Sequence, residues 1–327
     1  MELEIALNAR KDNAMKNAMK VGFVGLGSMG RGMVANLQKA GYQLVVNDLS
    51  QAAAVDAIAA GAMWAETPRE VAEDADLVFT SLPMPADVQA VSAGTDGLIA
   101  GLSEGKVWVD TSTNDLDVIR ELHGILVQKK VYLLDAPIGG SPHNTVRGDI
   151  IFWVGGEERA FQLAKPALDA ISENALFVGE CGSGTITKLV QNMFSLALLS
   201  VQIECLSMGV KAGVDMLPLW KALRQGRLGQ MRTFDLISAG FLPNKLDPAK
   251  FFLKLAEKDA RLALQIGRSN RVPMKLCSAV HQDMLEALNR GWEMRDAQSF
   301  LELQMERSGL PPSFLTQEEV DAVKEST

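Results

Sequence analysis

The chain has 327 residues and a mass of 35.3 kDa, which is enough for two domains that each bury a core. Its composition, 47% hydrophobic and 22% charged, is that of an ordinary globular protein. A formal net charge of -8 argues against a nucleic-acid partner, because such binders present a basic face. No uninterrupted apolar stretch approaches the roughly 18 residues of a membrane span, so we expect no membrane partner.

The N-terminal segment and the cysteines limit the expected cellular location and the kinds of site. Residues 1–20 mix acidic residues and lysines without an apolar core, which speaks against a signal or transit peptide, and we treat them as an N-terminal extension. The three cysteines, Cys181, Cys205 and Cys277, lie far apart and form no C-x-x-C pair. They therefore predict neither a disulfide framework nor a metal site, and they favour a reducing, cytoplasmic location.

Strands and helices are predicted to alternate from Val21 to about residue 182. The apolar run 21–27 predicts a strand and 28–40 a helix. Further strands are predicted at 43–50, 76–82, 106–113, 131–137 and 149–156, with helical patterns between most of them. Near-continuous apolar strands separated by helices are typical of a parallel sheet that is covered on both faces. The fold class is therefore α/β.

From Gly184 onward the sequence has helical periodicity and almost no strand signal. The stretch 185–213 is too long for a strand and is apolar on more than one side, so we expect a helix buried between domains or subunits. We predict three parts: the extension 1–20, a nucleotide-binding domain 21–182, and an all-α substrate and dimerisation domain 183–327. The apolar surplus of the long helix favours a homodimer or homotetramer.

A glycine-rich turn follows the first strand. In VGFVGLGSMG (21–30), Gly25, Gly27 and Gly30 fit the pattern G-x-G-x-x-G between a strand and a helix. The three glycines permit a tight turn, close approach of the backbone to a pyrophosphate, and close packing of helix on strand, respectively. The pattern predicts a dinucleotide site at the helix N-terminus, also contacted by Leu26 and Met29; the alternative is a glycine turn without a ligand.

Asp48 ends the second predicted strand, about 20 residues after the turn. There its carboxylate can accept hydrogen bonds from the ribose of the cofactor and would repel a 2′-phosphate. Leu49 and Ser50 follow with no arginine, so we expect NAD to be preferred over NADP, with Asn47 beside the same site. The alternative is that Asp48 is only a turn residue.

Five motifs in order give the chain a resemblance. They are GLGSMGRGMVANL (25–37), DTST (110–113), DAPIGG (135–140), GSGTITKLVQN (182–192) and EKDARLAL (257–264). Together they resemble the β-hydroxyacid dehydrogenase family, which includes 3-hydroxyisobutyrate dehydrogenase and is related to 6-phosphogluconate dehydrogenase. The resemblance spans about residues 21–308. It implies an N-terminal Rossmann-type doubly wound sheet and an all-α C-terminal domain.

The resemblance also implies a general acid/base. The family uses a lysine in G-x-G-x-x-x-K, which matches Gly182, Gly184 and Lys188 here, and Asn192 lies one helical turn further on the same face. Such a lysine needs a pKa lowered by burial or by a neighbouring cation. Lys258, in the family's K-D pair, is the candidate cation and is expected near the substrate and the nicotinamide.

The predicted substrate segment departs from the family pattern. The family's D-A-P-V-S-G-G segment offers backbone amides and a serine hydroxyl to the substrate carboxylate. Here Gly139 stands in place of the serine, and Ser141 in place of the second glycine. We expect Gly139, Gly140 and Ser141 to bind the substrate, and a substrate other than 3-hydroxyisobutyrate, with a bulkier or differently charged tail.

Two other segments are predicted to contact the cofactor. Leu82 and Pro83 follow the third predicted strand, and Thr113 follows the fourth. The expected function is thus an NAD-dependent oxidoreductase that interconverts a small β-hydroxyacid and its semialdehyde or keto form. Two alternatives are imine reduction on the same scaffold, against which Lys188 counts, and a non-catalytic nucleotide-binding module.

Overall fold

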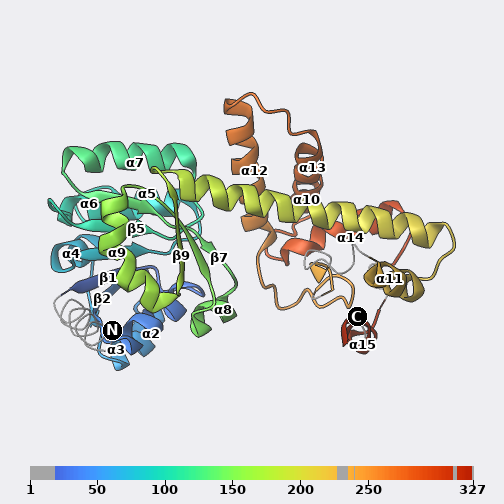
Figure 1. Ribbon diagram of the computed structural model, residues 1–327, viewed down its shortest axis with the longest axis horizontal. Helices are drawn as coiled ribbons and strands as arrows, with labels where there is room; N and C mark the ends of the chain where they lie inside the picture. The colour runs from blue at the N-terminus through green and yellow to red at the C-terminus, as the bar shows by residue number, and fades with distance from the viewer. Residues whose placement is uncertain (1–18, 227–234, 239, 312–314, 326–327) are drawn as a thin grey trace, which may run out of the picture. The chain divides into compact units, whose positions relative to one another are not determined.

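The computed structural model describes residues 19–226, 235–238, 240–311 and 315–325; residues 1–18 of the predicted extension lie outside this range. The chain divides into two compact units, the first ending at Lys188 and the second beginning at Leu189. In Figure 1 the first unit contains a sheet with helices, and the second is helical.

The described part of the first unit contains one nine-stranded sheet in the order β3-β2-β1-β4-β5-β6-β8-β7, with β9 paired to β8. Its strands are β1 (Lys20–Val24), β2 (Gln43–Asn47), β3 (Met63–Trp64), β4 (Leu77–Thr80), β5 (Val107–Asp110), β6 (Tyr132–Asp135), β7 (Ile138–Gly139), β8 (Ile151–Gly155) and β9 (Asn174–Gly179). From β3 to β6 every pairing is parallel. The carboxyl ends of these strands therefore share one edge, where the order reverses between β1 and β4, and this switch point is where doubly wound sheets bind ligands.

The expectation of a purely parallel sheet is wrong at its far end. The strand β8 runs antiparallel to both β6 and β7. Only eleven residues separate Gly139 from Ile151, and a parallel return needs a crossover of a dozen or more. Three strands were also not predicted: β3 and β7 have two residues each, and β9 is an edge strand whose side chains are mostly exposed.

Helices cover both faces of this sheet (Figure 1). They are α2 (Gly30–Lys39), η1 (Gln51–Ala54), α3 (Val55–Ala59), α4 (Pro68–Asp74), α5 (Pro85–Ser92), α6 (Leu98–Gly101), α7 (Leu116–Gln128), α8 (Pro142–Arg147) and α9 (Glu158–Ile171). Buried residues of α2, α3 and α9 form one core with Phe23 and its neighbours, and those of α4 to α7 form a second core around Trp108. Successive strand residues point to opposite faces, so both cores draw on the same strands.

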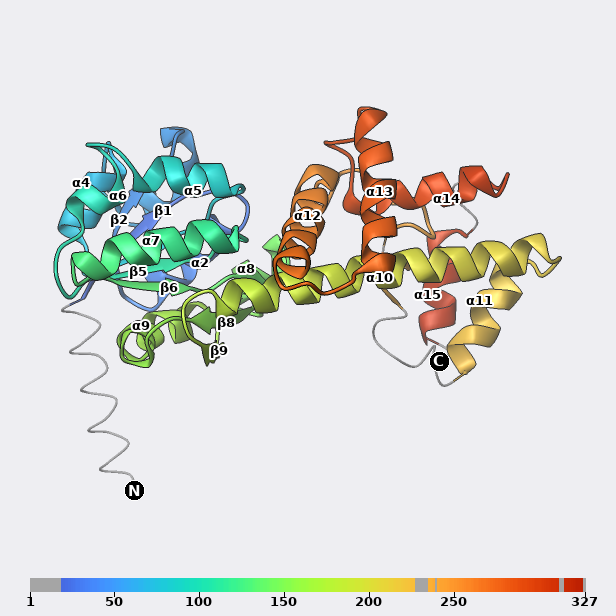
Figure 2. The ribbon, with the colours of Figure 1, turned by 90° about the horizontal axis from the view of Figure 1, so that it is seen from above.

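The second unit is built from helices (Figure 2). They are α10 (Ser183–Lys211), which begins in the first unit, α11 (Met216–Gln225), α12 (Leu253–Ser269), α13 (Lys275–Asn289), η3 (Ala297–Phe300), α14 (Leu301–Arg307) and α15 (Gln317–Glu325). Their shared core includes Trp220, Phe241, Phe300 and Met284, and α10 contributes a row of residues from Leu189 to Leu206.

Among the described helices, α10 alone is long and apolar enough to pass a membrane-span test by length and composition, with 39% of its most apolar window buried. The sequence predicted this long apolar helix but no membrane span. Because α10 carries the row of core residues just described, we interpret it as a core helix.

Candidate active site

The glycine turn has room for a ligand at one position and none at the others. Gly25 has φ +95°, and a Cβ there would lie 2.4 Å from the carbonyl oxygen of Ser81. A Cβ on Gly30 would lie 2.0 Å from the carbonyl oxygen of Gly25, whereas a Cβ on Gly27 would meet nothing within 4 Å. Two of the glycines are thus required by the fold, and Gly27 leaves an exposed space in front of α2 that fits a cofactor phosphate.

Asp48 fastens this turn to the end of β2. Its Oδ2 accepts a hydrogen bond from the Leu26 amide at 2.7 Å, and its Oδ1 accepts one from the Ser50 amide at 2.9 Å. Two further acceptor positions of the carboxylate remain for ribose hydroxyls. The side chain of Asn47, which was predicted beside the cofactor, donates to the carbonyl of Ala65 at 2.9 Å and thereby holds the chain after β3.

Of the remaining predicted cofactor contacts, Met29 and Thr113 are half-buried and Pro83 is exposed. The Leu82 amide donates to Ser112 Oγ at 3.0 Å, which joins the loops after β4 and β5. A buried carboxylate beneath them, Asp110, accepts hydrogen bonds from Thr80 Oγ1, the Ser112 amide and Asn114 Nδ2. Burial raises the pKa of Asp110, and these hydrogen bonds oppose the shift.

The start of α10 is fixed by Asp135 at the end of β6. Its Oδ1 accepts from the Gly182 amide and its Oδ2 from the Thr185 amide, each at 2.7 Å. Burial raises the pKa of Asp135 to about 6, although the two amides oppose the shift. The carboxylate also lies at the positive end of the helix dipole.

Steric constraints explain why positions 182 and 184 of the G-x-G-x-x-x-K motif are glycines. Gly182 has φ +95°, and a Cβ on Gly184 would lie 2.3 Å from the carbonyl oxygens of both Asp135 and Trp153. Any side chain at 184 would push the helix away from the sheet. The motif therefore fixes the distance between α10 and the sheet, and with it the position of Lys188, one turn further along the helix.

Lys188 is half-buried, and its Nζ lies 6.0 Å from the centroid of the Trp153 ring. Trp153 is on β8, the strand whose carbonyl meets Gly184. An aromatic face at this distance attracts a cation electrostatically. The predicted general acid/base thus lies beside the Trp153 side chain of β8.

The predicted substrate segment lies between β7 and α8. Gly139 is buried, while Gly140 is exposed with φ +138°. Ser141 is the N-cap of α8: its hydroxyl bonds to the side chain of Asn144, and its amide donates to Asn144 Oδ1 at 3.0 Å. The Ser141 hydroxyl is therefore engaged in capping the helix.

In the second unit, three residues of two predicted motifs come together. Asn192 Nδ2 donates to Asp259 Oδ2 at 2.6 Å, and Lys258 Nζ lies 3.1 Å from Asp259 Oδ1. Lys258 and Asp259 are both buried. A buried ion pair with a further amide donor is costly to break, because removing one partner leaves the other charge uncompensated. Asp259 thus orients Asn192, one turn beyond Lys188 on α10.

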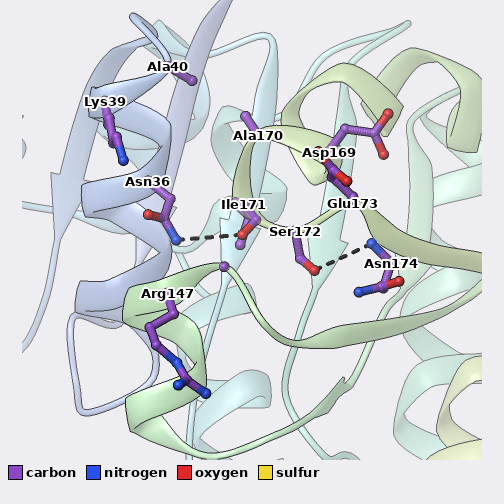
Figure 3. A pocket seen from close by; sticks show the side chains of 11 residues that line it. Asn36, Lys39, Ala40, Arg147, Asp169, Ala170, Ile171, Ser172, Glu173 and Asn174 are labelled. Carbon is purple, nitrogen blue, oxygen red and sulfur yellow. Dashed lines mark hydrogen bonds between the residues drawn. The ribbon is translucent and has the colours of Figure 1, made fainter.

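A surface hollow of about 480 Å³ lies elsewhere on the first unit (Figure 3). Lys39, Arg147, Asp169 and Glu173 give it charges of both signs, and none of the predicted site residues lines it. Asn36 donates from one side of it to the carbonyl of Thr145 at 2.7 Å, which ties α8 to α2. The hollow has no bearing on the predicted chemistry.

Sequence reasoning did not single out Asp110, Asp135 or Trp153 as residues that shape the site. The two aspartates open the quoted motifs DTST and DAPIGG, so a signal for them was present. A charged residue at the end of an apolar strand, followed by loop residues, indicates a buried hydrogen-bonded carboxylate. Trp153 had no such signal, because it resembles any aromatic residue in a strand.

Comparison with known proteins identifies the two parts. A family model described as the NAD binding domain of 6-phosphogluconate dehydrogenase matches residues 20–179. A second, described as NAD-binding of NADP-dependent 3-hydroxyisobutyrate dehydrogenase, matches residues 182–304. The second match includes all of α10.

Individual proteins agree with these matches. The chain is 30% identical to mitochondrial 3-hydroxyisobutyrate dehydrogenase of Mus musculus, over 90% of this chain and 89% of that protein. It is 29% identical to 2-(hydroxymethyl)glutarate dehydrogenase of Eubacterium barkeri, over 82% and 89%. A solved structure of Mycobacterium tuberculosis 3-hydroxyisobutyrate dehydrogenase with L-serine aligns with a TM-score of 0.76 at 24% identity, over 88% of this chain and 99% of that one. The predicted fold class is confirmed.

Proposed function

Because the chain belongs to the β-hydroxyacid dehydrogenase family, as a member similar to 3-hydroxyisobutyrate dehydrogenase, we propose that it interconverts a small β-hydroxyacid and its semialdehyde or keto form, with Lys188 as the general acid/base. Relatives of this chain are dehydrogenases of hydroxyacids and act on CH–OH groups. The observation that carries the proposal is the fixed position of Lys188, three residues beyond the Asp135–Thr185 hydrogen bond.

The substrate class follows from chemistry that two relatives share. 3-Hydroxyisobutyrate and 2-(hydroxymethyl)glutarate, the compounds in their names, are both 3-hydroxypropanoates that carry a substituent at C2, a methyl and a carboxyethyl group respectively. We propose a substrate of this class for the present chain, with Gly139 and Gly140 in the segment that faces its carboxylate.

Residues of the first unit would hold the cofactor. Gly27 and the N-terminus of α2 would take the pyrophosphate, and Asp48 the ribose of the adenosine. A carboxylate at this place repels a 2′-phosphate, which is why we propose NAD rather than NADP. When bound, the nicotinamide accepts the hydride released from the hydroxyl-bearing carbon.

In this proposal Lys188 transfers the hydroxyl proton. Oxidation of the alcohol releases the hydroxyl proton, which Lys188 Nζ accepts as a neutral amine; in reduction the ammonium returns it. The anchored start of α10 limits the positions that this amine can take, because Gly184 and Asp135 leave the helix no room to slide along the sheet. Asn192, held by Asp259, adds a hydrogen-bonding amide one turn further on.

Replacing the lysine tests this proposal. Lys188→Ala should lower kcat by about two to four orders of magnitude, the usual loss when a general acid/base is removed, while NADH binding persists. Lys211→Ala, at the exposed end of the same helix, serves as the control and should keep the wild-type rate. Near-full turnover by Lys188→Ala would remove this residue from the mechanism.

Substrate panels separate the alternatives. NADH consumption with small semialdehydes supports the dehydrogenase, and consumption with cyclic imines alone would favour imine reduction. Binding of NADH without turnover of either class would favour a non-catalytic module.

We also propose a homodimer or homotetramer. Val190, Phe194, Val201 and Met208 are all exposed on α10, at spacings of four, seven and seven residues that place them on one side of the helix. Such a row of apolar side chains is typical of an interface. Phe194→Glu should therefore lower the mass measured by light scattering; an unchanged assembly would place the interface elsewhere.

A further inference from the structure

A side chain at position 139 has no room in this fold. Gly139 ends β7 and pairs with Ile151 of β8. A Cβ on Gly139 would lie 2.5 Å from Ile151 Cγ2 and 2.5 Å from Trp153 Cη2, where ordinary contacts begin near 3.4 Å. Gly139 is not among the residues with positive φ, so space and not backbone conformation excludes a side chain.

The same indole lies beside Lys188. Trp153 is half-buried, and Lys188 Nζ is 6.0 Å from its ring centroid. One side chain therefore lies beside two predicted site positions from different elements, Gly139 on β7 and Lys188 on α10. All three belong to the first compact unit.

We propose that Trp153 is a specificity-determining residue. Its indole forms an apolar wall beside Lys188, and the C2 substituent of the substrate packs against this wall. Residue 139, where the family pattern has a serine hydroxyl, is a glycine here, and the tip of the Trp153 indole occupies the space that a side chain at 139 would need. The inference rests on the proposed function for the identity of the substrate's remaining groups.

The chemistry of the wall selects a class of substituent. An indole offers a large apolar surface, whose burial against another apolar group is favourable, and offers nothing to balance a second charge. The preferred substrate is thus a 3-hydroxypropanoate with an aryl or branched alkyl group at C2.

Binding of unreactive acids tests the wall without turnover. Affinities of propanoate and 2-phenylpropanoate for the protein saturated with NADH are measured by calorimetry. We expect the phenyl acid to bind wild type at least about tenfold more tightly, within the roughly 10- to 200-fold range of apolar pocket contacts. Trp153→Ala should lower this ratio about tenfold or more, and Trp153→Phe should retain most of it. Trp64→Phe, on the distant edge strand β3, is the matched control.

A paired substitution tests the shared space. Gly139→Ser should lower the melting temperature of the wild-type protein, and should lower it less in a Trp153→Ala background, because the indole no longer meets the new side chain. Equal losses in the two backgrounds would overturn the idea that the two residues compete for one volume.

Two further results would overturn the proposal: equal binding of the two acids by wild type, or a ratio that stays the same or rises in Trp153→Ala. Turnover of 3-hydroxypropanoate and 3-hydroxy-2-phenylpropanoate with NAD is a separate readout. No turnover of either, with the binding ratio dependent on Trp153, would refute the dehydrogenase proposal and leave the apolar wall standing.

Discussion

The glycine turn allows cofactor binding to be separated from folding with a single methyl group. In Gly27→Ala the new Cβ meets no protein atom within 4 Å, and the residue is not among those with positive φ. The substitution should leave stability unchanged or raise it by up to about 1 kcal/mol, because alanine restricts the unfolded chain. The methyl group would instead occupy the space that we assign to the pyrophosphate.

The matched variant Gly30→Ala should behave in the opposite way. Its Cβ would lie 2.0 Å from the carbonyl oxygen of Gly25 and 3.1 Å from the ring of Phe23. Relief of the first contact requires a backbone shift of more than about 1 Å, and overpacking of this kind costs about 1–3 kcal/mol. We expect a clear loss of stability in Gly30→Ala.

Two measurements on each variant suffice. Energy transfer from tryptophan to NADH gives the dissociation constant, and urea unfolding gives the free energy of unfolding. Gly27→Ala should weaken NADH binding about 10- to 100-fold, equivalent to about 1.4–2.7 kcal/mol, at wild-type stability. Gly124→Ala, an exposed glycine of α7 with open space around it, controls for the methyl group itself. Wild-type affinity in Gly27→Ala would refute the placement of the phosphates at this turn.

Two more predictions concern carboxylates. Burial raises the pKa of Asp135 from 3.8 in the unfolded chain to about 6 in the native protein. The contribution of this carboxyl to the free energy of unfolding is therefore full below pH 3.8. It falls by about 3 kcal/mol as the pH rises through 6. The difference in unfolding free energy between wild type and Asp135→Asn should follow this decline from pH 3.5 to 7.5, and a constant difference would contradict it. Asp48→Ser combined with Leu49→Arg should shift the ratio of kcat/KM values toward NADPH, by removing a carboxylate and adding a phosphate partner; an unchanged preference would mean that the ribose lies elsewhere.

Local patterns predicted much of the first unit. The apolar runs 43–50, 76–82, 106–113 and 131–137 each contain a strand of the parallel part of the sheet. The observed strands are shorter than these runs, because strand pairing stops before loop residues such as Asp48 and Thr113. The helical residues that follow β2 begin as a 3-10 turn, η1, and the helix predicted from residue 28 begins at Gly30.

The N-cap of α7 depends on the tertiary structure. Ser112, Thr113 and Asp115 all carry side chains that can cap a helix, and Asp115 is the N-cap, whose Oδ1 accepts from the Asp117 amide at 2.8 Å. Ser112 accepts from Leu82 instead. Several residues with capping side chains stood within four positions, and the sequence alone could not rank them.

The sequence by itself determined the glycine turn and the order of most elements, because each depends on residues close together in the chain, and a short family motif offered Lys188 as the candidate lysine. Only the tertiary structure decided that β8 reverses direction, that Asp135 holds an amide 47 residues away, and that Trp153 fills the space over Gly139. These contacts depend on the register between strands and on the depth at which α10 meets the sheet. Such long-range geometry is set by packing of the whole unit, and no local pattern encodes it.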